Sequence, residues 1–269
     1  YGQMEIDEIP VYEDPTTGEQ TQALTITAGK DANDEQRTVT VQRTDNRDYR
    51  LFTTDTIYDA DSDWDITING LTMQGGKTAE QGGALYVQGN VIDLTLDQTT
   101  IQNNTGLSAV YLESATDTTV TLTNAGINNT TSGDGLHNIS ANDFTLTADH
   151  STINNNKLTG ITNESATSDI TLTYTNINGN TKDGLHNTNT GDFTFVADHS
   201  TISNNGLSGI TSESATADIS LTYVSITGNT GSGVDSTTTG GETNFYAFNT
   251  TIANNKVDGI QLDSDTSIN

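Results

Sequence analysis

A repeat of about 25 residues constrains the fold of this chain more than any other feature of its sequence. The repeat is marked by an isoleucine that precedes an Asn- or Gly-containing turn, and successive copies lie 24 to 26 residues apart. The copies are Ile101, Ile127, Ile153, Ile177, Ile202, Ile226 and Ile252. A second aliphatic position recurs at the same spacing between Leu85 and Ile260. A chain with this period is expected to stack similar units on one another.

Each repeat contains three short runs in which apolar and polar residues alternate, such as Val120-Thr-Leu122 and Ile170-Thr-Leu172. Alternation with a period of two residues predicts strands with one face in the core, and no segment shows a helical period of useful length. We therefore predict an all-β chain that forms a right-handed three-stranded parallel β-helix, with about 25 residues per coil and strands about 4.8 Å apart.

The repeat also suggests how the chain is organised. Residues 1–20 are acidic and hold both prolines, and we expect an irregular N-terminal edge or cap there. Residues 21–64 are expected to form less regular first coils, and residues 65–269 regular coils. Residues 136–184 and 185–233 agree at 32 of 49 positions, so two coils form one duplicated unit. Because residues 259–269 align with the interior of a repeat, we expect a fragment of a longer repetitive protein.

Composition excludes several classes of function. Asp and Glu outnumber Lys and Arg by 36 to 9, for a net charge of −27, which disfavours nucleic acids and anionic membrane surfaces as partners. No apolar run of about 18 residues is present, so we expect no membrane contact by this segment. The absence of cysteine excludes disulfides, thiolate zinc sites and thiol catalysis.

One segment carries a resemblance to a known family. It comprises Gln81-Gly-Gly-Ala-Leu-Tyr86, followed by Leu94-Thr-Leu-Asp-Gln-Thr-Thr-Ile-Gln-Asn-Asn-Thr105. These motifs resemble the polymorphic outer-membrane protein repeat and, more broadly, autotransporter passengers and bacterial surface adhesins. Ile101 stands where that family has an aromatic residue, and Gly-Gly-Ala occurs once. The resemblance implies a secreted module, displayed at the outer membrane, that attaches to host or matrix proteins or glycans, or to identical chains.

Stacking aligns the residues that follow each inward aliphatic anchor, and two outward columns are candidate partner-binding surfaces. The first contains Tyr86, Tyr111, His137 and His186, whose rings could stack on sugars or enter a partner. The second contains Glu113, Glu164 and Glu213, which recur in every second coil. The alternative is that the aromatic residues only suit exposed strands, and that the acids only keep the rod soluble.

Two further patterns predict a turn structure and a metal site. The Asn-rich turns are expected to adopt left-handed backbone and to form an amide ladder. Its predicted members are Asn103, Asn129, Asn155, Asn204, Asn229 and Asn254. The alternating acids Asp59, Asp61, Asp63 and Asp65 are typical of a calcium-binding loop, although the Gly and the later Glu of an EF-hand are missing.

The function expected from these features is adhesion through a lateral face of the rod, without catalytic residues. The alternatives are a structural stalk and a polysaccharide hydrolase or lyase. All four arginines, Arg37, Arg43, Arg47 and Arg50, precede the regular coils, which disfavours elimination chemistry. The carboxylate pairs Asp149/Asp198 and Glu164/Glu213 repeat by translation, whereas an active site is singular. Ice binding by the outward Thr-x-Thr pairs is a weaker alternative.

Overall fold

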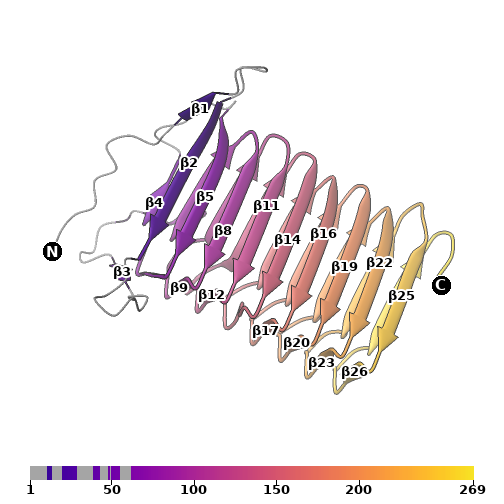
Figure 1. The fold of residues 1–269 in the computed structure, drawn as a ribbon. Coiled ribbons are helices and arrows are strands. Elements are labelled where there is room, and N and C mark those ends of the chain that lie inside the picture. The colour runs from indigo at the N-terminus through magenta and orange to yellow at the C-terminus, as the bar shows by residue number, and fades with distance from the viewer. Residues whose placement is uncertain (1–10, 14–19, 29–38, 43–47, 49, 55–61) are drawn as a thin grey trace.

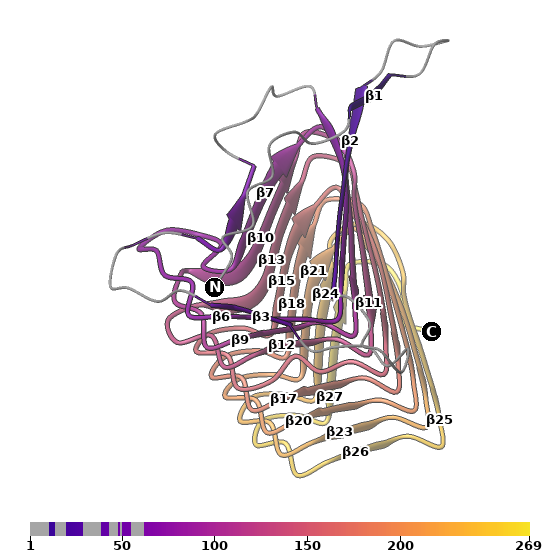
Figure 2. The same cartoon turned by 60° about the vertical axis from the view of Figure 1, so that its left-hand side comes forward.

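A computed structural model describes residues 11–13, 20–28, 39–42, 48, 50–54 and 62–269 of the chain. The described strands wind into a coil of triangular cross-section (Figures 1 and 2), with about eight turns of about 26 residues each. The predicted right-handed three-stranded parallel β-helix is confirmed. Among the described residues, the structure contains no helix with the length and apolar character needed to cross a membrane.

The strands of successive coils pair into continuous sheets. The ten-stranded sheet contains β1 (Val11–Glu13), β2 (Gln20–Thr27), β5 (Asp63–Asn69), β8 (Ile92–Asp97), β11 (Thr118–Thr123), β14 (Asp143–Asp149), β16 (Thr167–Thr173), β19 (Asp192–Asp198), β22 (Thr216–Thr222) and β25 (Thr243–Phe248). The nine-stranded sheet contains β4 (Phe52–Thr53), β7 (Leu85–Gly89), β10 (Ser108–Ser114), β13 (Asp134–Ser140), β15 (Ile161–Ser165), β18 (Leu185–Asn189), β21 (Ile210–Ser214), β24 (Val234–Thr238) and β27 (Ile260–Ser264).

The third side of the triangle consists of short strands in two groups. They are β3 (Val39–Gln42), β6 (Leu71–Gln74), β9 (Thr100–Gln102) and β12 (Gly126–Asn128), then β17 (Asn176–Asn178), β20 (Thr201–Ser203), β23 (Ser225–Thr227) and β26 (Thr251–Ala253). Thr152 links the groups through isolated parallel bridges to Gly126 and Asn176. All pairs of named strands are parallel except β1 with β2, which is antiparallel.

The core is a set of vertical columns, because each strand places its alternate side chains inward at a fixed register. Leu136 pairs with Ile161 and Ile161 with Leu185, so these three side chains stack as expected. All three are fully buried, as are Trp64 and Phe144. The core therefore positions every outward residue of the neighbouring register, which is what builds the surface columns.

The asparagine turns have two separate roles. Asn103, Asn129, Asn155, Asn204 and Asn254 have φ between 53° and 58°, the left-handed conformation that asparagine tolerates best among non-glycine residues. The buried amide ladder lies one residue later, and of the predicted members only Asn229 belongs to it. Its members are Asn104, Asn156, Asn180, Asn205, Asn229 and Asn255.

In this ladder, Nδ2 of Asn180 donates to Oδ1 of Asn205 at 3.1 Å and to the Ile153 carbonyl of the previous coil at 3.1 Å. The backbone N–H of Asn180 donates to the same Oδ1 of Asn205. The prediction of the ladder was one residue out because the first Asn of each pair turns the chain. That turn directs the second Asn inward, where its amide must be satisfied.

Candidate functional site

The predicted aromatic and histidine residues share one face of the nine-stranded sheet. Strand register aligns them in a single column, which we call the aromatic–histidine column. Its members are Tyr86, Tyr111, His137, Thr162, His186, Thr211, Asp235 and Gln261. The structure therefore brings Tyr86, Tyr111 and His137 together on adjacent strands, and it places His186 two strands further along.

Ring stacking holds the N-terminal part of this column. The rings of Tyr86 and Tyr111 are 5.2 Å apart and stacked, and His137 lies 5.5 Å from Tyr111. The Arg50 guanidinium lies 4.4 Å from the centre of the Tyr86 ring, a cation–π contact. The expectation that this part of the column faces solvent is wrong for Tyr111, which is 7% exposed because rings cover both of its faces.

Tyr111 keeps one polar atom in use. Its hydroxyl donates to Oε2 of Glu113 at 3.3 Å. Burial raises the pKa of the Tyr111 phenol, and the negative charge of Glu113 raises it further. Tyr111 is therefore a protonated hydrogen-bond donor at every pH at which the fold operates.

A buried carboxylate orients His137. Oδ2 of Asp134, a residue 7% exposed, lies 3.1 Å from Nδ1 of His137 and accepts a hydrogen bond from the Thr162 hydroxyl. The other oxygen of Asp134 accepts the backbone N–H of Thr159. Since an ionised carboxylate only accepts, Nδ1 carries the proton and the neutral ring presents an unprotonated Nε2. That Nε2 is buried without a hydrogen-bond partner, 3.7 Å from Oε1 of Glu164.

The duplicated unit repeats this arrangement at His186, with looser geometry. Nδ1 of His186 lies 3.7 Å from Oδ2 of Asp183, a carboxylate whose Oδ1 accepts from the Ser208 N–H and the Thr211 hydroxyl. The interaction with Asp183 raises the pKa of His186, although partial burial opposes the rise. The His186 side chain is 37% exposed, against 13% for His137.

The predicted acidic residues form a second column on the same face. Glu113 and Glu164 are separated by Ile139 in the register, and Glu164 and Glu213 by Thr188. Acids thus recur in every second coil, roughly 9.6 Å apart at two strand spacings. They flank the aromatic–histidine column, so the face combines rings, imidazoles and carboxylates.

The calcium prediction falls partly outside the described residues, where Asp59 and Asp61 lie. Asp63 and Asp65 lie on β5. Oδ1 of Asp63 accepts hydrogen bonds from Nδ2 of Asn90 and the N–H of Val91, so it fixes a turn of the next coil. In the described part of the chain, no group of three or more His, Asp or Glu side chains is arranged to hold a metal ion. A calcium site stays a prediction.

A second aromatic column was not predicted from the sequence. His150, Tyr174, His199 and Tyr223 stack at 4.6 to 4.9 Å, at the turns that follow strands of the ten-stranded sheet. All four have φ between 46° and 53°, a strained conformation for bulky residues. Stacking offsets this strain, and it also leaves only ring edges for a partner.

Sequence reasoning also missed Asp134 and Asp183, although a signal was present. Asp-Gly-Leu-His occurs at residues 134–137 and again at 183–186. An acid three residues before each histidine, in both copies, indicates a paired role.

Comparisons with known proteins give one solved structure with a similar fold. No family model matches the chain, and no curated protein matches it. The crystal structure of pectate lyase Pel9A aligns with a TM-score of 0.56 and 10% sequence identity, covering 94% of this chain and 80% of that one. At this identity the similarity shows the fold, a pectate lyase-like β-helix. The resemblance to autotransporters and outer-membrane adhesins gains no support.

The expectation that the chain is not an enzyme is corrected by this finding. The similar β-helix is that of a pectate lyase, so the architecture points to lyase activity as a hypothesis for this chain. The error arose from treating translational repetition as evidence against a singular site. The coils repeat, but Tyr111 neighbours only one of the two column histidines.

Proposed function

We propose that the chain is a polysaccharide-cleaving β-helix that acts by elimination on a uronic-acid-containing glycan. The observation that carries the proposal is the contact between Tyr111 and His137, with Asp134 fixing the proton of His137 on Nδ1. A permanently protonated donor and an imidazole with a free nitrogen are the acid and base that such a reaction needs.

His137 is the proposed base. Its Nε2 takes the proton from the sugar carbon next to the carboxylate, and the electron pair left behind forms a carbon–carbon double bond. The bond from the neighbouring carbon to the glycosidic oxygen breaks at the same time. Glu164, which lies 3.7 Å from Nε2 and is 55% exposed, swings aside to admit the sugar and then stabilises the imidazolium.

Tyr111 is the proposed acid. The departing glycosidic oxygen takes the phenolic proton, which leaves a phenolate and a new hydroxyl on the released chain. The proton on His137 then returns to Tyr111 through solvent, so both groups recover their starting forms. The raised pKa of Tyr111 makes the phenolate short-lived.

Electrostatics restrict the substrate. The flanking Glu113 and Glu164 disfavour a densely charged polymer, as does the net charge of −27. Arg50 lies at the end of the column, where its guanidinium can pair with the carboxylate of a neighbouring sugar unit. This arrangement favours a glycan in which uronic acids alternate with neutral sugars.

The proposal includes the expectations about location and partners. Polysaccharides of this kind lie outside the cell, so we place the chain among secreted or surface-displayed proteins, with a glycan as its partner. Attachment to that glycan and its cleavage use the same face, so an adhesive role remains a second candidate. It is favoured if the glycan is retained but not cleaved.

The test is incubation with polygalacturonate, alginate and a glycan of alternating uronic acid and neutral sugar. Unsaturated ends are followed by ultraviolet absorbance, and reducing ends by a colour reaction. We expect unsaturated ends from the alternating polymer, with His137→Gln and Tyr111→Phe slowing their release roughly 100-fold or more. The matched control, His150→Gln, changes an exposed histidine outside the nine-stranded sheet and should leave the rate unchanged. Reducing ends without unsaturation, or no product from any polymer, would contradict elimination.

A further inference from the structure

The ten-stranded sheet carries a regular threonine column that ends abruptly near β19. Strand register aligns one outward residue of each strand from β5 to β25. The column reads Thr67, Thr95, Thr121, Thr147, Thr171, Val196, Ser220 and Tyr246. Five threonines are thus followed by three different residues. A break in an otherwise repeated surface marks a singular place on the rod.

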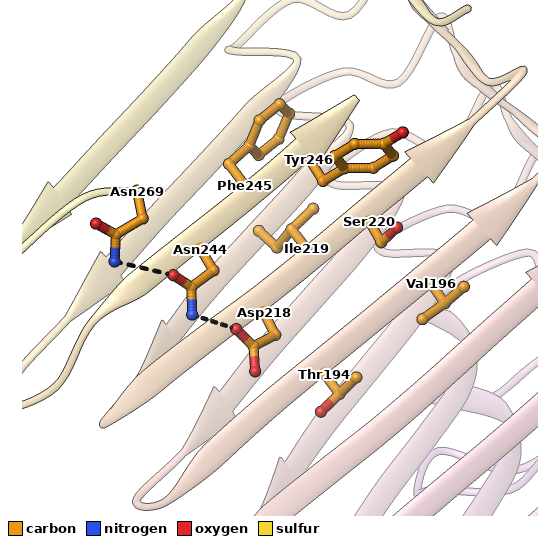
Figure 3. Close-up of a pocket in the computed structure, with 9 residues that line it drawn as sticks. All are labelled: Thr194, Val196, Asp218, Ile219, Ser220, Asn244, Phe245, Tyr246 and Asn269. Carbon is orange, nitrogen blue, oxygen red and sulfur yellow. Dashed lines mark hydrogen bonds between the residues drawn. The ribbon is translucent and has the colours of Figure 1, made fainter. Parts of the chain in front are cut away.

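The break creates a groove, shown in Figure 3. Ser220 lies between Val196 and Tyr246, and its small side chain leaves a hollow of about 360 Å³. Val196 and Tyr246 are two strand spacings apart, roughly 9.6 Å. This volume lies in the range of small-ligand sites, about 300–1,000 Å³.

One wall of the groove is an aromatic ring with an open face. Tyr246 is 58% exposed, and no other ring among the described residues stacks on it. Tyr174 and Tyr223 are also exposed, but both faces of each are occupied by rings of the second aromatic column. Tyr246 can therefore accept a flat, partly apolar ligand where the stacked tyrosines cannot.

The other side of the groove is a chain of polar side chains. Nδ2 of Asn269 donates to Oδ1 of Asn244 at 3.0 Å, and Nδ2 of Asn244 donates to Oδ1 of Asp218 at 2.6 Å (Figure 3). These bonds hold the planar groups in one row and leave Oδ2 of Asp218 to accept from a ligand. The hydroxyls of Thr194 and Ser220 also line the groove and can donate or accept.

From this geometry we infer a binding subsite for one neutral sugar ring, with Tyr246 as its platform and Asp218 as its main hydrogen-bond acceptor. A pyranose presents C–H groups on its face and adjacent hydroxyls on its edge. That division matches an open aromatic face beside a row of carboxylate and amide groups. No cation lines the groove, and Asp218 is anionic, so a uronate or phosphate is disfavoured.

The subsite is independent of the proposed cleavage. It lies on a different side of the triangular coil from the aromatic–histidine column (Figure 2). It would hold a neutral glycan against the rod whether or not the nine-stranded sheet is catalytic.

The test is saturation-transfer NMR with neutral tetrasaccharides of glucose, mannose and galactose, and with tetragalacturonate. We expect at least one neutral tetrasaccharide to bind with a dissociation constant on the order of 1 mM, a weak affinity typical of a single shallow subsite. Tyr246→Ala should weaken binding at least tenfold. Ser220→Tyr, which fills the groove and keeps Tyr246, should do the same.

Tyr174→Ala is the matched control, because it removes an exposed tyrosine whose faces are already covered. It should bind as the parent does, and circular dichroism should show the same strand content for all variants. The inference is overturned if no neutral tetrasaccharide binds, if only tetragalacturonate binds, or if Tyr246→Ala binds as tightly as the parent. Cleavage activity is measured separately, so the two proposals can fail independently.

Discussion

The two copies of the duplicated unit have nearly the same sequence but different surroundings. In the first copy, His137 lies 3.1 Å from Asp134 and packs against Tyr111. In the second, His186 lies 3.7 Å from Asp183 and follows Thr162 in the column. In a stacked fold, each residue faces the coils above and below rather than its own copy. Duplication therefore repeats the Asp–His pair but not the chemistry around it.

The largest expected effect tests whether the two copies are equivalent inside. Leu136 and Leu185 are both fully buried and occupy the same core column. Leu136→Ala and Leu185→Ala should each lower the free energy of unfolding by about 2–5 kcal/mol, through lost burial and a residual cavity. Denaturant unfolding followed by circular dichroism measures both. A near-neutral result for one of them would show that the copies already differ in the core.

A sharper test separates the two copies by activity. Asp134→Asn removes the acceptor that holds the proton on Nδ1 of His137, and we expect a loss of about 100-fold or more in the rate of elimination. Asp183→Asn makes the same change beside His186, which lacks a tyrosine neighbour, and should leave the rate within about twofold. Equal losses from both substitutions would mean that the tyrosine does not distinguish the copies.

A smaller effect concerns protonation in the second copy. The interaction with Asp183 raises the pKa of His186, so protonation of His186 stabilises the fold at low pH. This contribution is complete below the unfolded pKa of about 6.5 and is lost as pH rises through the folded value. We expect Asp183→Asn to lower the pKa of His186 in an NMR titration. An unchanged titration would rule out the pairing.

The smallest effect concerns Asp235, which occupies the histidine position in the third unit of the column. Burial raises its pKa, and Asp263, Asp183, Asp258 and Glu213 raise it further. Its ionised form therefore destabilises the fold above the folded pKa. Asp235→Asn should stabilise the protein at pH 7 by about 0.5 kcal/mol, as expected for a half-exposed charge. At a pH well below the ordinary Asp pKa the gain should vanish, as comparison of melting temperatures would show.

The fold was predictable because a repeated pattern reports the same constraint many times. The aliphatic positions that include Leu136 and Ile161 recur at coil spacing and alternate with polar residues, so both the period and the inward face are legible. The amide ladder was placed one residue early. Sequence shows two adjacent asparagines, but only the backbone reveals which one turns the chain and which one points inward.

The candidate site was less predictable because it depends on neighbours in the stack. Sequence placed Tyr86, Tyr111, His137 and His186 in one column, which the register bears out. It could not show that stacked rings bury Tyr111 or that Asp134 reaches back to His137. These facts depend on side-chain rotamers and on contacts between coils that no periodicity specifies.

The buried asparagine ladder has a consequence for how such a rod can change length. Each amide bonds the equivalent residue one coil away, so every link requires the two coils to be in phase. Loss of a single residue upstream of a turn would leave an amide facing the wrong partner, whereas loss of a complete coil would rejoin the same pattern. Variation in length within proteins of this design is therefore expected to come in whole coils, as rungs are added to or removed from a ladder.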